Sequence, residues 1–64
     1  MTTLAIHFND KPYTIIENVT AYWQNAEYWH VRTSFGNRPE ERMYAKKNVI
    51  AVFEVINDER RRII

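Results

Sequence analysis

The chain has 64 residues and no cysteine, so we expect one small domain without disulfides or thiolate metal ligands. Nine Lys and Arg against eight Asp and Glu leave a net charge of +1, which excludes the basic excess of a dedicated nucleic-acid binder. No apolar stretch is long enough to cross a membrane and the first residues lack a signal-peptide pattern, so we expect a cytoplasmic protein without a membrane partner.

The first third of the chain predicts two strands joined by a turn. Alternating apolar residues indicate a strand over about residues 3–8, and turn-forming residues follow it. Residues 13–23 are dense in β-branched and aromatic side chains, which favour a strand, but Glu17 and Asn18 have weak β propensity. We therefore expect a bulge or bend at these two residues that curves the sheet.

The next segment predicts a hairpin flanked by aromatic pairs. A polar linker at residues 24–27 separates two Tyr-Trp pairs and is typical of a hairpin loop. In the strand that runs from there to residue 35, successive side chains face opposite sides of the sheet. We expect Trp23 and Trp29 to face the core as large apolar anchors.

The second half of the chain predicts a turn, two more strands and a tail. Residues 36–40 contain the only glycine and a proline and predict a turn, after which a fourth strand covers about residues 42–46. Residues 49–56 are apolar on both parities, which favours a strand covered on both faces or in contact with another subunit, with a buried helix as the competing interpretation. Residues 57–64 form a charged tail, either a helical turn or an edge strand.

These elements predict a single small domain over residues 1–64 that is mainly β. We expect an antiparallel meander of about five strands, curled as an SH3-like or Sm-like half-barrel, with the hairpin of the aromatic pairs at its centre. The side chains expected in the core are Leu4, Ile6, Phe8, Val19, Trp29, Val31, Val49, Ala51 and Phe53.

The chain lacks the residue combinations that catalysis and metal binding require. His7 and His30 lie on different predicted strands without metal-ligand spacing, and the carboxylate pairs at 40–41 and 58–59 fall in a turn and in the tail. There is no nucleophile with an adjacent base and no glycine-rich phosphate loop. We therefore predict that the protein is not an enzyme and has no catalytic residue, metal or cofactor.

One predicted solvent-facing surface combines aromatic and basic side chains. Aromatic residues interleaved with cations can stack on bases and contact phosphates, but they can equally form cross-strand pairs that only stabilise a small sheet. The candidate binding face consists of Tyr22, Tyr28, His30, Arg32, Lys46 and Lys47.

Parts of the chain resemble known proteins. Residues 17–22, the aromatic strand after them and the pattern Tyr44-x-Lys46-Lys47 before the last apolar run resemble small uncharacterised strand-rich proteins of phages, prophages and low-GC Gram-positive bacteria. This resemblance implies a context of mobile genetic elements. A second likeness, to bacterial Sm-like RNA chaperones, rests on a Tyr-Lys step before an Ile/Val strand. The spacing differs here and the N-terminal helix of those proteins is missing, so no RNA-binding residue is carried over.

Two functional hypotheses follow. Near-neutral charge and the lack of chemistry favour a non-catalytic protein-protein interaction or accessory module of phage or prophage origin, with an unidentified protein as its partner. The alternative is a small-barrel nucleic-acid-binding protein, with a binding surface made of Tyr28, His30, Arg32, Lys46, Lys47 and the arginine run at 60–62. We also expect a homodimer or a larger assembly, formed by sheet packing or edge pairing, because residues 49–56 and the terminal isoleucines leave apolar surface that a small monomer struggles to cover.

Overall fold

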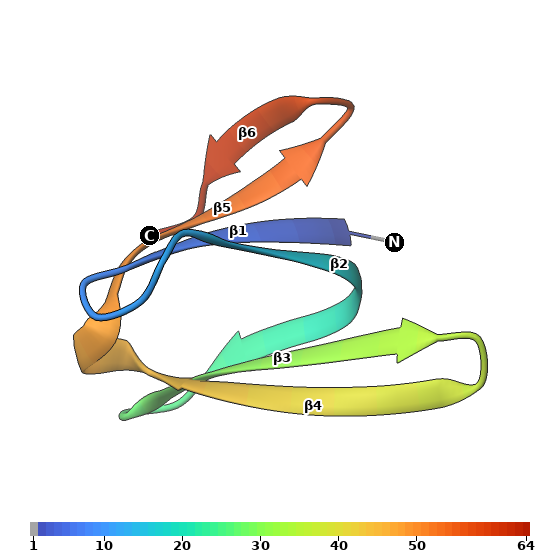
Figure 1. The fold of residues 1–64 in the computed structure, drawn as a ribbon, viewed down its shortest axis with the longest axis horizontal. Coiled ribbons are helices and arrows are strands. Elements are labelled where there is room, and N and C mark those ends of the chain that lie inside the picture. Colours follow the sequence, from blue (N-terminus) through green and yellow to red (C-terminus); the bar gives the residue numbers. More distant parts are fainter. Residues whose placement is uncertain (1) are drawn as a thin grey trace.

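The computed structural model describes residues 2–64 and contains six antiparallel strands in one open sheet (Figure 1). The expected mainly β, antiparallel fold is therefore confirmed, with six strands where about five were expected. The segment 49–56 is a strand, and the tail contributes the sixth. The elements are β1 (Thr2–Phe8), β2 (Thr14–Gln24), β3 (Tyr28–Phe35), β4 (Arg38–Ala45), the 3-10 turn η1 (Lys46–Asn48), β5 (Val49–Ile56) and β6 (Glu59–Arg62).

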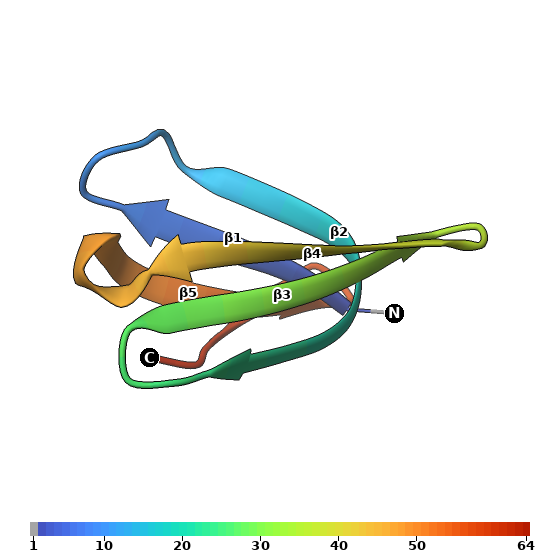
Figure 2. The same ribbon diagram turned by 90° about the horizontal axis from the view of Figure 1, so that it is seen from below.

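The strand order across the sheet is β4-β3-β2-β1-β5-β6. Strands β1 to β4 form a meander, and η1 then leads the chain to the free side of β1, where β5 and β6 pair. Figures 1 and 2 show that β2 bends, so that its first half lies beside β1 and its second half beside β3. The sheet thus folds over on itself around a core. In residues 2–64, no helix has the length and apolar character needed to span a membrane.

The bend in β2 contains two irregularities. Asn18 has a φ of 58°, in the left-handed region that asparagine tolerates better than most residues. At this point the pairing with β1 slips, so that Ile16 and Val19 both turn to the core, and the bulge predicted at Glu17-Asn18 is confirmed. The pairing with β3 slips again between Val19 and Ala21.

The second slip reverses the expected direction of the side chains at the end of β2. Tyr22 turns inward and packs against the core, while Trp23 turns outward and is 37% exposed. Trp29 on β3 is 2% exposed, as expected for a core anchor. The prediction that Trp23 shares the core with Trp29 is therefore wrong, because a strict alternation along β2 does not survive the extra residue.

The core draws side chains from four of the strands. Val52 and Ile16 belong to it although neither was expected there, and Val49 packs against it only partly buried. In β5 the pairing slips between residues 49 and 51, so that Val49 and Val52 face inward while Phe53 faces the other side of the sheet. The prediction of Phe53 in this core is thus wrong. The cluster consists of Leu4, Ile6, Phe8, Ile16, Val19, Trp29, Val31 and Val52.

The turn between β3 and β4 is shorter than the sequence indicated. Only Gly36 and Asn37 form it, and β4 begins at Arg38, so a turn is present where it was predicted but the expected extent over residues 36–40 is too long. Gly36 has a φ of 62°, as the first central residue of a type II′ hairpin turn requires. Because such a turn pairs its flanking residues directly, Pro39 becomes part of an edge strand.

The outward side of β1 and β5 carries a second apolar cluster, called here the β1–β5 face: Ala5, His7, Tyr13, Ala51 and Phe53. The His7 ring lies 4.4 Å from the Tyr13 ring and 5.6 Å from the Phe53 ring, between centroids. Ala5 and Ala51 are buried on this outer side. The chain therefore covers much of the second side of β5 with its own side chains.

Candidate functional site

The outward side of β3 and its neighbours presents a row of large side chains. Trp23 on β2 lies opposite His30 on β3, which in turn lies opposite Met43 on β4. Tyr28 and Arg32 flank His30 on the same side of β3 because strand residues two apart share a face. These five side chains, Trp23, Tyr28, His30, Arg32 and Met43, are called here the β3–β4 face.

The rings of this face are in contact with one another. Trp23 and His30 stack with 5.2 Å between ring centroids and an interplanar angle of 3°. The Arg32 guanidinium carbon lies 5.1 Å from the Trp23 ring centroid, a cation–π distance. The Tyr28 ring meets His30 edge-on at 6.4 Å. Trp23 is thus held against His30 and Arg32 while part of its indole stays open to solvent.

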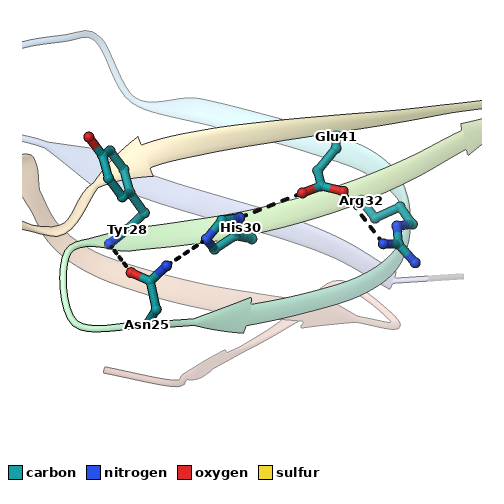
Figure 3. Close-up of polar contacts among 5 residues, drawn as sticks. All are labelled: Asn25, Tyr28, His30, Arg32 and Glu41. Atoms are coloured by element: carbon teal, nitrogen blue, oxygen red, sulfur yellow. Dashed lines mark hydrogen bonds and ion pairs between the residues drawn. The ribbon is translucent and has the colours of Figure 1, made fainter.

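A chain of polar contacts fixes the His30 imidazole (Figure 3). Asn25 Oδ1 accepts hydrogen bonds from the backbone N–H groups of Glu27 (2.9 Å) and Tyr28 (2.8 Å). This fixes the amide so that Asn25 Nδ2 donates to His30 Nε2 at 3.0 Å. Since Nε2 accepts, the neutral imidazole carries its proton on Nδ1, which faces Glu41 Oε1 at 3.6 Å.

The same contacts define what His30 can do chemically. Both of its ring nitrogens face protein atoms, and Nδ1 is buried without a partner within hydrogen-bonding distance. The imidazole is therefore placed to support the Trp23 ring, with neither nitrogen directed at a ligand. Across residues 2–64, no group of three or more His, Cys, Asp or Glu side chains could hold a metal ion.

The basic residues of the predicted face are mostly engaged by neighbouring groups. Arg32 Nη2 lies 3.5 Å from Glu41 Oε2, and Lys46 Nζ donates to the Asn25 carbonyl at 3.2 Å. Lys46 and Lys47 belong to η1 and, together with Tyr28, line an open cleft of about 340 Å³ at the end of the β3–β4 face. The structure therefore groups Tyr28, His30 and Arg32 on one face and places both lysines at its edge.

Tyr22 does not belong to this face, so the prediction that included it in the candidate binding face is wrong. It packs against the core, and its hydroxyl donates to Glu54 Oε2 at 2.6 Å. Arg61 Nη2 lies 3.3 Å from the other carboxylate oxygen of Glu54. The hydrogen bond to Glu54 raises the pKa of the Tyr22 phenol above its ordinary value, burial and the Glu54 charge raise it further, and Arg61 opposes the rise.

Sequence reasoning missed three residues of the site: Trp23, Asn25 and Met43. The Met43 position follows from the register that a two-residue Gly-Asn turn imposes on β4, a signal available in the sequence. Asn25 in a short polar loop is likewise a recognisable Asx-turn residue. The outward direction of Trp23 depends on the second slip in β2, for which the sequence offers no comparable signal.

Comparisons of the chain with protein-family models, with curated proteins and with solved structures find no match. The resemblance to phage and prophage proteins stays a prediction.

Proposed function

We propose that this protein is a non-catalytic interaction module that binds another protein through the β3–β4 face. The observation that carries this proposal is the exposed apolar row on that face. Trp23 is 37% exposed and Met43 54% exposed, and the row sits on a stacked imidazole held by Asn25.

The composition of the face is that of a protein-recognition surface. Aromatic residues, methionine and arginine are enriched in the buried centre of protein interfaces, and Trp, Tyr and Arg supply most binding hot spots. The Asn25–His30 contact holds the Trp23 ring before any partner arrives, which lowers the entropic cost of binding. The face therefore offers both apolar area and a fixed shape.

The charges of the face favour protein over nucleic acid. Phosphate contacts need cations that can release counterions, but Arg32 lies beside Glu41 and Lys46 donates to a backbone carbonyl. One observation supports the alternative, a nucleic-acid binder: the cleft that Tyr28 shares with Lys46 and Lys47. Glu27, which also lines this cleft, opposes binding of an anion there.

Salt dependence separates the two functions. A generic single-stranded oligonucleotide would be titrated at low and moderate salt, with Trp fluorescence as the readout. We expect no binding, or weak binding that Lys47→Ala leaves unchanged. Tight binding that falls steeply with salt and is lost in Arg32→Ala and Lys46→Ala would replace the protein-binding proposal by the alternative.

The protein-binding proposal itself needs a capture experiment with matched variants. We propose the phage or prophage origin on the sequence resemblance alone, so the lysate of a low-GC Gram-positive host is the natural source of partners. A specific partner should be retained by the unmodified protein and by Ile15→Ala, which truncates an exposed apolar side chain elsewhere. It should be lost in Trp23→Ala and Met43→Ala; equal capture by all four proteins would reject this face.

A further inference from the structure

Strand β4 is a long and regular free edge of the sheet. It lies at the end of the strand order, and among residues 2–64 nothing pairs with its outer side. All eight of its residues pair with β3 without a slip, whereas the pairings within β1–β2, β1–β5 and β2–β3 each contain one. Figure 1 shows β4 along the lower rim, with the β3–β4 turn projecting beyond the other strands, as Figure 2 also shows. An unprotected edge of this kind is a template for another strand.

The turn at Gly36-Asn37 determines which backbone groups face that edge. A two-residue hairpin turn makes Phe35 and Arg38 a hydrogen-bonded pair, and hydrogen-bonded and non-hydrogen-bonded pairs then alternate. The backbone of Pro39, Glu41 and Met43 consequently faces outward. Proline sits where its missing N–H breaks no bond to β3, and Glu41 and Met43 keep outward N–H donors.

The side chains of β4 favour a second copy of this chain as the strand that pairs with the free β4 edge. A two-fold antiparallel pairing brings residues of the same face together. Centred on Glu41, it places Glu40 opposite Arg42 of the second copy, twice, on the inward side. It also places Pro39 opposite Met43 of the second copy, where the Met43 N–H can donate to the Pro39 carbonyl in both directions.

The neighbouring registers lack this complementarity. Centred on Glu40, the pairing sets Glu40 against itself and Arg38 against Arg42 of the second copy, and centred on Arg42 it sets that arginine against itself. In the register centred on Glu41, the two central carboxylates each have an Arg32 guanidinium 3.5 Å away, which offsets their repulsion. The other outer edge, β6, is four residues long and holds three arginines, so self-pairing there brings like charges together.

We propose that two copies of this chain pair antiparallel along β4, centred on Glu41, and form a homodimer with one continuous sheet. The two β3–β4 faces then lie side by side on the same surface. The dimer needs no partner of another kind and does not rest on the proposed function.

Charge reversal tests the register. Sedimentation equilibrium of the unmodified protein should give twice the chain mass of 7.8 kDa. Glu40→Arg and Arg42→Glu should each weaken dimerisation about tenfold, because each turns both ion pairs into repulsive pairs. The double variant restores opposite charges and should regain the original dimerisation constant. A monomeric unmodified protein, or a double variant weaker than either single variant, would overturn the proposal.

Two further variants keep the test independent of folding. Met43→Pro removes an outward N–H but no bond to β3, so it should abolish the dimer and preserve the circular dichroism spectrum, whereas Met43→Ala should remain dimeric. Since the chain has no cysteine, a single spin label at Glu41→Cys reports on the centre. Two labels there should show dipolar broadening, since directly opposed α carbons lie about 5.5 Å apart. A dimer without such broadening would point to another contact and refute this register.

Discussion

The two outward faces of the sheet use the same residue types to opposite effect. On the β1–β5 face, the His7 ring lies against Tyr13 and Phe53, and Ala5, which pairs with Phe53, is completely buried. On the β3–β4 face, His30 lies beneath a stacked Trp23 that stays partly exposed, with Met43 open beside it. His7 thus packs in a cluster that covers one side of the sheet, whereas His30 supports an exposed ring on the other. The difference lies in the small residues beneath the first cluster and in the polar contacts from Asn25 beneath the second.

The sealed face should be the more sensitive of the two to added bulk. Ala5→Leu forces a larger side chain beneath rings that already contact one another, and we expect a loss of about 1 to 3 kcal/mol in unfolding free energy. Ala21→Leu, on the outward side of β2 beside Arg32, should change stability by less than about 0.5 kcal/mol. Urea denaturation of both variants measures this contrast, and equal losses would mean that the two faces are packed alike.

Tyr22 packs against the core, whereas Tyr28 lies on the exposed β3–β4 face. Tyr22→Phe takes away the donor to Glu54, a residue that is only 8% exposed, and should lower the unfolding free energy by about 1 kcal/mol. Tyr28→Phe, on the exposed face, should cost close to nothing. Thermal unfolding compares the stabilities of the two variants. A larger loss of stability in Tyr28→Phe than in Tyr22→Phe would contradict the inward position of Tyr22.

Thr33 lies on the inward side of β3, behind the exposed face. It is completely buried, and its hydroxyl has no hydrogen-bond partner. Valine has nearly the same shape without the unpaired oxygen, so Thr33→Val should raise the unfolding free energy by up to about 1 kcal/mol. Chemical denaturation decides this, and a clear destabilisation would show that the hydroxyl is satisfied in solution.

The pH dependence of Tyr22 is the smallest expected effect. Its folded pKa is raised, so the stability conferred by the Tyr22–Glu54 contact is present below the ordinary tyrosine pKa of about 10 and is lost as pH rises through the folded value. Tyrosinate absorbance should show a late-titrating component that disappears in Tyr22→Phe and titrates earlier in Glu54→Gln. An unchanged titration in Glu54→Gln would remove the carboxylate as the cause.

The sequence predicts the features that depend on local pattern. The alternation in residues 3–8 and the β-branched run at 49–56 indicate strands, and the weak β propensity of Asn18 marks the bulge. These signals are sufficient for the fold class. They also place most of the core, because β1 and β3 alternate without interruption from Leu4 to Phe8 and from Trp29 to Thr33.

The direction of the side chains that follow a register slip could not be predicted. One extra residue in β2 exchanges the directions of Tyr22 and Trp23, and another in β5 exchanges those of Val52 and Phe53. A period of two transmits each slip to every later side chain of the strand. The predicted outward direction is therefore right for the side chains of Tyr28, His30 and Arg32, which lie on the regular strand β3, and wrong for Tyr22.

The open aromatic surface of the β3–β4 face is tested most directly by whether Trp23 is accessible to solvent while Trp29 is enclosed in the core. Trp29→Phe leaves only Trp23, and Trp23→Phe leaves only Trp29, so acrylamide quenching of each folded variant reports one ring. Acrylamide should quench Trp23 strongly, whereas the emission of Trp29 should be blue-shifted and protected. Equal quenching of the two, or protection of Trp23, would contradict the claim that the β3–β4 face presents an open aromatic surface.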